Sequence, residues 1–158
     1  MFGYKDYRQT LTQFMQLLLD RFDNKLISFV VFGSVARGTA GKESDVDLLI
    51  VLKDVPDVYY KRLKPVIDIE LQLREGGETP VFSCIILSLE EAKENRNIFL
   101  DMIDASIILY DKDDFFKNRL KELNNRLLQL GSKKVVLDDK TWYWNLKPDI
   151  KLGEVIEL

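Results

Sequence analysis

The residues best suited to chemistry lie between Gly33 and Asp47, in the segment GSVARGTAGKESDVD. A short apolar run ends at Gly33-Ser34, where the missing Cβ lets backbone N–H groups approach an anion and the serine hydroxyl adds a donor. Asp45 and Asp47 open the next apolar run, and side chains two residues apart in a strand face the same side. Two such carboxylates beside an anion-binding turn indicate a site where a divalent metal ion bridges the protein and phosphate groups.

Each half of this segment also has a purely structural explanation. Gly-Ser is a common turn, and an Asp-x-Asp pair at a strand edge is often only a solvated rim. Two carboxylates on one face repel each other unless a cation compensates them. Arg37 is the nearest basic residue to supply that compensation, although its position also suits a phosphate contact. The combined order of strand, Gly-Ser turn, helical turn, Asp-x-Asp and strand favours the phosphate and metal interpretation.

The elements that must position this segment can be read from hydrophobic periodicity. Apolar residues at helical spacing predict an amphipathic helix over Tyr4 to Phe22, and β-branched apolar runs predict buried strands. We therefore expect an α/β (α+β) fold, with a mixed sheet flanked by helices and a C-terminal helix and tail. We expect residues 1–110 to form the core and residues 111–158 to pack on it in one compact domain. The predicted strands are Leu26 to Phe32, Val46 to Leu52, Val81 to Leu87 and Ser106 to Tyr110.

One segment allows two interpretations. Beyond Pro65, apolar and polar residues alternate from Val66 to Leu73, which is the period of a strand. The second interpretation is a helix from Asp57 to Glu75 with a kink at the proline. Further along, Ser88 and Glu91 fit a capping box that opens a helix carrying Phe99, Met102 and Ile103.

The C-terminal third is expected to hold one long helix and an irregular tail. Asp113 or Asp114 can cap a helix from Phe115 to Leu130, which ends at Gly131. The tail from Ser132 to Leu158 carries the aromatic residues Trp142, Tyr143 and Trp144. We expect these rings to dock the tail on the body, with stacking on a nucleotide base as the alternative.

Composition narrows the chemistry. The 158-residue chain contains no histidine, which excludes Ser-His-Asp triads and histidine-based acid–base schemes. Its net charge of −3 and its scattered basic residues argue against a nucleic-acid surface. No run of about 20 apolar residues and no signal-peptide pattern is present. Cys84 is the single cysteine and is expected to be a buried structural thiol, so a cytoplasmic location is the default.

The segment resembles the signature of the DNA polymerase beta-like nucleotidyltransferase superfamily, in its minimal, antitoxin-like branch. The resemblance implies Mg²⁺ or Mn²⁺ as metal and a nucleoside triphosphate, with ATP favoured, as donor. It implies that Asp45 and Asp47 bind the metal and are catalytic, and that the nucleotide contacts come from Gly33, Ser34, Arg37 and Ser44. The matching positions are Gly33, Ser34, Arg37, Gly38, Ser44, Asp45 and Asp47.

The superfamily usually places a third carboxylate on the next core strand. If that strand is Val81 to Leu87, the candidate positions hold Ser83 and Ile85, and neither is acidic. If Val66 to Leu73 is the strand instead, Asp68 or Glu70 supplies the third metal ligand.

The sequence thus predicts an enzyme that transfers a nucleoside monophosphate to a protein or small-molecule acceptor and releases pyrophosphate. The acidic chain favours such an acceptor over a polynucleotide. The resemblance implies a helical toxin-like partner, and it leaves self-association open. The alternative is a non-catalytic nucleotide-binding or partner-neutralising protein that lacks the third carboxylate.

Overall fold

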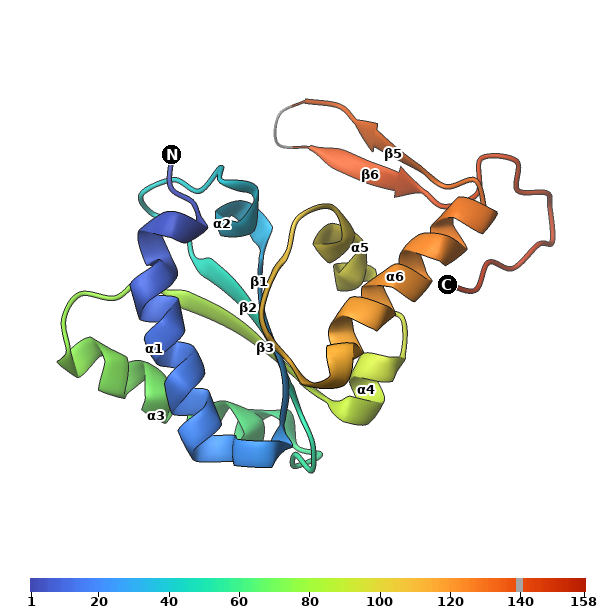
Figure 1. The fold of residues 1–158 in the computed structure, drawn as a ribbon. Coiled ribbons are helices and arrows are strands. Elements are labelled where there is room, and N and C mark those ends of the chain that lie inside the picture. The colour runs from blue at the N-terminus through green and yellow to red at the C-terminus, as the bar shows by residue number, and fades with distance from the viewer. Residues whose placement is uncertain (139–140) are drawn as a thin grey trace.

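The computed structural model describes residues 1–138 and 141–158 and shows a four-stranded mixed sheet with helices on both faces (Figure 1). This confirms the predicted fold class. A separate two-stranded hairpin follows the last helix. The helices are α1 (Tyr4–Phe22), α2 (Gly33–Arg37), α3 (Tyr59–Glu75), α4 (Leu89–Lys93), α5 (Asn97–Asp104) and α6 (Phe115–Gln129), with 3-10 turns at Asp23–Lys25 and Lys112–Asp114. The strands are β1 (Leu26–Phe32), β2 (Val46–Leu52), β3 (Phe82–Ser88), β4 (Ile107–Asp111), β5 (Lys133–Val136) and β6 (Trp142–Asn145).

The sheet has the order β3-β2-β1-β4, so the two strands that flank the chemical segment lie side by side at its centre. β1 pairs antiparallel with both β2 and β4, and β2 pairs parallel with β3. All seven residues of β1 are buried, as are six of the seven in β2, because both faces of these strands are covered. The exception in β2 is Asp47, which is partly exposed at its start.

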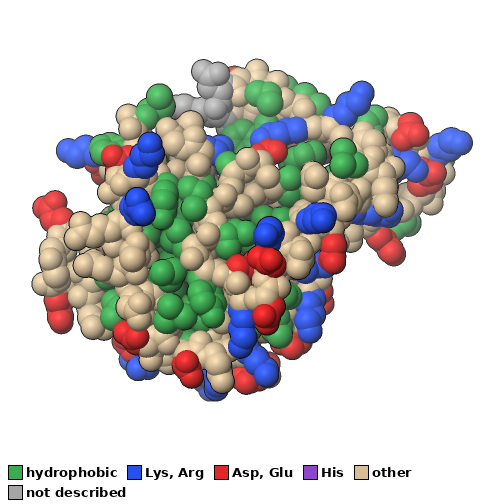
Figure 2. Space-filling view, viewed as in Figure 1, with side chains coloured by type: hydrophobic (Ala, Val, Ile, Leu, Met, Phe, Trp, Pro, Cys, Tyr) green, Lys and Arg blue, Asp and Glu red, His purple; other side chains and the backbone are tan. Residues whose placement is uncertain are grey.

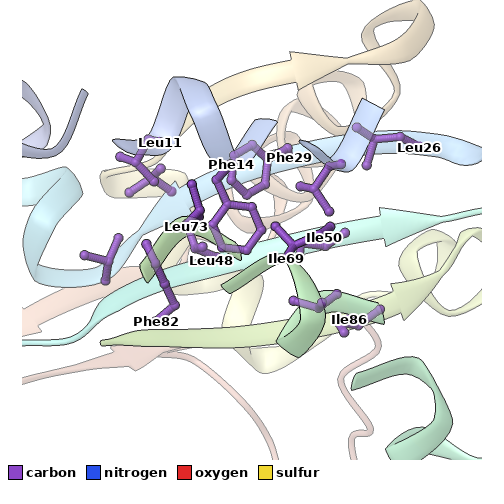
Figure 3. Packing of buried hydrophobic residues seen from close by; sticks show 14 of the residues in the cluster. Leu11, Phe14, Leu26, Phe29, Leu48, Ile50, Ile69, Leu73, Phe82 and Ile86 are labelled. Atoms are coloured by element: carbon purple, nitrogen blue, oxygen red, sulfur yellow. The ribbon is translucent and has the colours of Figure 1, made fainter. Parts of the chain in front are cut away.

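Helices α1 and α3 cover one face of the sheet, and α4, α5 and α6 cover the other (Figure 1). On the first face Phe14 of α1 stacks on Phe29 and meets Phe82 edge-on, at centroid distances of 5.5 and 5.0 Å (Figure 3). On the second face Phe99 of α5 meets Phe116 of α6 edge-on at 5.2 Å. Alternate residues of β2 therefore enter two separate cores, which holds the strand rigidly.

The ambiguous segment is a helix, which confirms the second of its two interpretations, so the strand alternative for Val66 to Leu73 is wrong. In α3 Ile69 and Leu73 lie four residues apart and are buried, whereas Ile67 and Leu71 are 47% and 55% exposed. An alternation of apolar residues places two pairs on different helix faces, and only one pair meets the sheet. Pro65 lies inside the helix, which continues through it.

Two further predictions need correction. Neither Asp113 nor Asp114 caps α6, because both adopt left-handed backbone angles and Asp111 accepts hydrogen bonds from the N–H groups of Phe116 and Lys117 at 2.9 and 3.0 Å. The capping box at Ser88 is confirmed, but the helix it opens ends at Lys93 and α5 follows separately.

The tail was predicted to be irregular, yet it contains the hairpin β5–β6, with Lys134 opposite Trp144 and Val136 opposite Trp142. Residues 139–140 of the tail lie outside the described part. Basic and acidic side chains are interspersed over the face seen in Figure 2. Among the described residues, no helix combines the length and the apolar character that crossing a bilayer requires.

Candidate nucleotide and metal site

Gly33 and Asp47 are packed directly against each other where β1 ends and β2 begins. Asp47 pairs with Phe32 across the two strands, so its carboxylate reaches the residue that follows β1. A methyl group added at Gly33 would lie 2.1 Å from Oδ2 of Asp47, which is far inside van der Waals contact. Gly33 also has a φ of +69°, a conformation that costs other residues about 1–2 kcal/mol. Glycine is therefore required here both by backbone geometry and by the carboxylate.

The chain changes direction directly after Gly33, at the end of β1. Gly33–Arg37 form the five-residue helix α2, which stops at Gly38 with a φ of +72°. The Thr39 backbone N–H donates to the Ser34 carbonyl at 2.9 Å and closes the turn. The first N–H groups of a helix have no partner within it and point away from the helix body. They can therefore receive an anion beside Asp47.

The two carboxylates interact, as their spacing predicts. Burial raises the pKa of Asp47 above its ordinary value of 3.8, and the charge of Asp45 raises it further. The charge of Arg37 and a hydrogen bond from the Ser83 hydroxyl oppose this rise. Asp45 itself is exposed. A half-buried carboxylate beside a second one is electrostatically unfavourable without a cation, and a divalent ion is the natural compensation.

Arg37 and Ser44 occupy different places around this pair. The exposed Arg37 side chain lies close enough to Asp47 to influence its pKa, and its guanidinium carbon lies 4.8 Å from the centre of the Trp142 ring. The Ser44 hydroxyl accepts a hydrogen bond from the Gly41 N–H at 2.9 Å. Ser44 thus closes the loop that leads into Asp45, and its hydroxyl is already engaged there.

Neither predicted source of a third carboxylate lies with Asp45 and Asp47. Asp68 pairs with Lys64 at 3.1 Å on the surface of α3. Glu70 accepts from the Cys84 thiol, with 3.6 Å between Oε1 and Sγ. Cys84 belongs to the core against α1 and α3, on the opposite face of the sheet from Asp47. In the described part of the chain, no three acidic or cysteine side chains are grouped closely enough to share a metal ion.

Cys84 is a partly buried thiol, and burial, followed by the charge of Glu70, raises its pKa above the ordinary value. This keeps it protonated and supports a structural role over a nucleophilic one.

The strand position beside Asp47 is occupied by Ser83. The parallel register places Ser83 directly opposite Asp47, and its hydroxyl donates to that carboxylate. Ser83 is exposed, so the position has space for a larger side chain. The superfamily resemblance expects a carboxylate on this strand, and the structure places an uncharged hydroxyl there.

Sequence reasoning missed the approach of the hairpin to this site. The Trp142 ring lies against Arg37, and its indole N–H donates to Asp101 of α5 at 3.3 Å. Lys134 of β5 lies 4.7 Å from the centre of the same ring and forms an ion pair with Asp104. The aromatic cluster was a visible signal, but nothing local in the sequence pairs it with Arg37.

This arrangement can bind phosphate and a hard cation. Carboxylate oxygens of Asp45 and Asp47 are the ligand type that Mg²⁺ and Mn²⁺ prefer, and Mg²⁺ is commonly held by one or two carboxylates together with substrate phosphates. Asp47 lies against the Gly33-Ser34 turn, so a metal ion held by this carboxylate would lie beside a phosphate chain bound at the turn. These residues fit a divalent metal, which would neutralise phosphate charge.

Comparison with known proteins agrees with this chemistry. Residues 11–139 match the model of the nucleotidyltransferase domain family. A protein of Methanocaldococcus jannaschii named "Putative protein adenylyltransferase MJ1305" is 31% identical over 134 residues, which cover 84% of this chain and 90% of that protein.

Two crystal structures share the fold. One is a toxin–antitoxin complex with AMP-PNP, at a TM-score of 0.51 and 16% identity, over 77% of this chain and 92% of the matched chain. The other is a mutant of the MntA-HpeT toxin–antitoxin complex, at a TM-score of 0.51 and 14% identity over the same shares of the two chains. The family match over most of the chain, on a fold that places Asp47 against the Gly-Ser turn, shows that this protein belongs to the nucleotidyltransferase domain family.

Proposed function

We propose that this protein transfers a nucleoside monophosphate from ATP to a hydroxyl group of a protein acceptor. The acceptor oxygen forms a bond to the α-phosphorus. The bond between the α-phosphorus and the oxygen that bridges the α- and β-phosphates breaks, and pyrophosphate leaves with that electron pair. The hydroxyl proton passes to water. The observation that carries the proposal is the contact between Gly33 and the Asp47 carboxylate, which unites a phosphate turn with a metal ligand.

Each site residue has a distinct role in this proposal. The backbone at Gly33 and Ser34 receives the phosphate chain, and Arg37 offsets its charge. Asp45 and Asp47 hold Mg²⁺ or Mn²⁺, which supplies charge neutralisation to the departing pyrophosphate. Ser44 keeps Asp45 in place by closing the loop before it.

The choice of a protein acceptor is supported by the relative named as a protein adenylyltransferase, which matches over most of both chains. The chain is acidic, with a pI near 5.1, and its charges are mixed over the face seen in Figure 2. A polynucleotide acceptor would be expected to need a basic surface. The toxin–antitoxin complexes with the same fold suggest a helical toxin-like protein as the first acceptor to test.

A second function has its own supporting observation. Ser83 stands beside Asp47 where a third carboxylate would complete the metal site. A protein with two carboxylates can retain the nucleotide without activating an acceptor hydroxyl. We therefore carry a nucleotide-binding, partner-neutralising role as the alternative.

One assay separates the two functions. The purified chain is incubated with Mg²⁺, ATP labelled on the α-phosphate, and a cell lysate or candidate partner, beside an Asp45→Asn/Asp47→Asn control. Transfer of label to a protein band, lost in the control, is the expected result. Metal-dependent ATP binding without transfer to any of several acceptors would favour the alternative.

A further inference from the structure

The C-terminal hairpin reaches the proposed nucleotide site through one aromatic ring. Trp142 lies on β6, and Arg37 ends the short helix α2 that begins at Gly33. The guanidinium carbon of Arg37 lies 4.8 Å from the Trp142 ring centre, within the range of a cation–π interaction. Figure 1 shows the hairpin on the α5 side of the sheet, close to the end that carries α2.

Trp142 is itself held in place from the other side. Its indole N–H donates to Asp101 at 3.3 Å, and Lys134 on the neighbouring strand is anchored to Asp104 of the same helix. Trp144, on the same face of β6, packs against the core that α5 and α6 share with the sheet. The ring is therefore held against α5, and Arg37 is the more exposed member of the pair.

The energetic consequence concerns Arg37. An exposed arginine side chain loses rotamer entropy when it binds a phosphate. Contact with a fixed ring removes part of that freedom in advance, which lowers the cost of binding. The ring also leaves the outer N–H groups of the guanidinium available, because a cation–π contact engages its face.

We propose that Trp142 is a positioning residue that holds Arg37 ready for the phosphates of the nucleotide, which makes the hairpin β5–β6 part of the binding site. This inference rests on the proposed function and goes beyond it, because the Gly33–Asp47 segment alone does not call for the hairpin. Stacking of Trp142 on the base is the less favoured role. Its indole N–H is already engaged by Asp101, and both Arg37 and Lys134 lie against the ring.

The test compares binding of ATP and of tripolyphosphate, each with Mg²⁺, by isothermal titration calorimetry on the full chain. Trp142→Leu keeps an apolar side chain but removes the ring, and Trp142→Phe keeps a ring. Trp142→Leu is expected to weaken both ligands equally, by roughly three- to tenfold, and Trp142→Phe to restore most of the loss. Tyr143→Leu is the matched control, because Tyr143 is exposed on the opposite face of β6 and should leave both affinities unchanged.

A double-mutant cycle with Arg37→Ala decides whether Trp142 acts through Arg37. In the Arg37→Ala background, Trp142→Leu is expected to change neither affinity by more than about twofold. An undiminished loss in that background would overturn the inference, and so would a loss confined to ATP, which would point to base stacking.

Failure of the proposed function has a different outcome. If the wild-type chain binds neither ligand, or binds them equally well after Asp45→Asn/Asp47→Asn, the proposed function falls and this inference falls with it. If wild-type binding is intact and metal-dependent but the cycle is additive, only the role of Trp142 is wrong.

Discussion

Two groups of charged residues beside the same sheet have opposite electrostatic character: Arg62 with Glu91, on helices α3 and α4, and Asp45 with Asp47, at the start of the central strand β2. Arg62 of α3 is only 6% exposed, and its guanidinium pairs with Glu91 at 2.5 Å. The same side chain donates to the backbone carbonyls of Pro56 at 2.6 Å, Ile86 at 3.4 Å and Asp57 at 3.5 Å. Asp47, by contrast, faces a second carboxylate and has no ion pair among the described residues.

The pKa directions follow this difference. The hydrogen bond from Arg62 is the main cause that lowers the pKa of Glu91 below its ordinary value. Burial and then Asp45 raise the pKa of Asp47. Removing one member of a fully paired, buried charge group destabilises a fold, whereas a carboxylate whose pKa is raised by burial and a like charge is a candidate binding residue. The comparison therefore separates a structural network from the proposed binding site within one small protein.

The largest effect is expected from Arg62→Ala. Loss of the guanidinium leaves Glu91 and three backbone carbonyls without their donor, so the free energy of unfolding should fall by about 3 kcal/mol. Urea denaturation followed by circular dichroism measures this. Lys64→Ala removes only the exposed pair with Asp68 and should cost well under 1 kcal/mol. Equal losses in the two variants would show that the Arg62 network contributes no more to stability than an exposed ion pair.

Gly33→Ala should cost about 2 kcal/mol or more and also weaken Mg²⁺-dependent nucleotide binding. The new methyl group meets the Asp47 carboxylate at 2.1 Å and must displace it. Gly131→Ala is the matched control, because Gly131 has a φ of +66° with nothing within 4 Å of the added group. Gly131→Ala should lower the free energy of unfolding only through its unfavourable backbone conformation and should leave nucleotide binding intact. Unaltered nucleotide binding in Gly33→Ala would contradict the proposed contact between turn and metal ligand.

Ser83→Asp is expected to tighten Mn²⁺ binding roughly tenfold, equivalent to about 1.4 kcal/mol, by placing a third carboxylate beside Asp47. Without metal the same variant should be less stable than wild type, because it adds a like charge to the pair. Metal titration with and without nucleotide measures the gain, and Ser83→Asn serves as the uncharged control. A gain of the same size in Ser83→Asn would show that charge is not the cause.

The smallest expected effect is an increase in the stability of the folded chain on substitution of Asp47. Asp47→Asn should raise the free energy of unfolding of the metal-free chain by about 1 kcal/mol at pH 7, while removing metal-dependent binding. The pKa of Asp47 is raised in the folded state, so its ionisation costs stability as pH rises through that value, and the advantage of Asn should vanish below about pH 3.8, the ordinary value.

Glu91→Gln provides the opposite case for the same measurement. The pKa of Glu91 is lowered by folding, so its contribution is present at neutral pH and is lost as pH falls through the folded value. Denaturation curves for both variants across the acid range check the two signs. A destabilised Asp47→Asn at neutral pH would contradict the view that the charge of Asp47 is only partly compensated in the fold.

Much of the framework could be predicted because its signals are local. Apolar runs ending at Gly33 and beginning at Val46 defined β1 and β2 within a residue, and the capping box at Ser88 marked the start of α4. The alternation beyond Pro65 was misleading, because the same residues bury Ile69 and Leu73 when they are helical. Whether this segment forms a strand or a helix depends on the sheet against which it packs.

The sequence alone thus determined which functional groups the candidate site contains. These are a glycine at a turn, a hydroxyl, an arginine and two carboxylates spaced to share a strand face. Those properties follow from residue type and backbone period. The tertiary structure decided what these groups meet. It set Asp47 against Gly33, turned Glu70 toward Cys84, placed Ser83 beside Asp47 and brought Trp142 to Arg37. Such contacts join segments distant in the chain, and they depend on strand register and helix packing that no local pattern encodes.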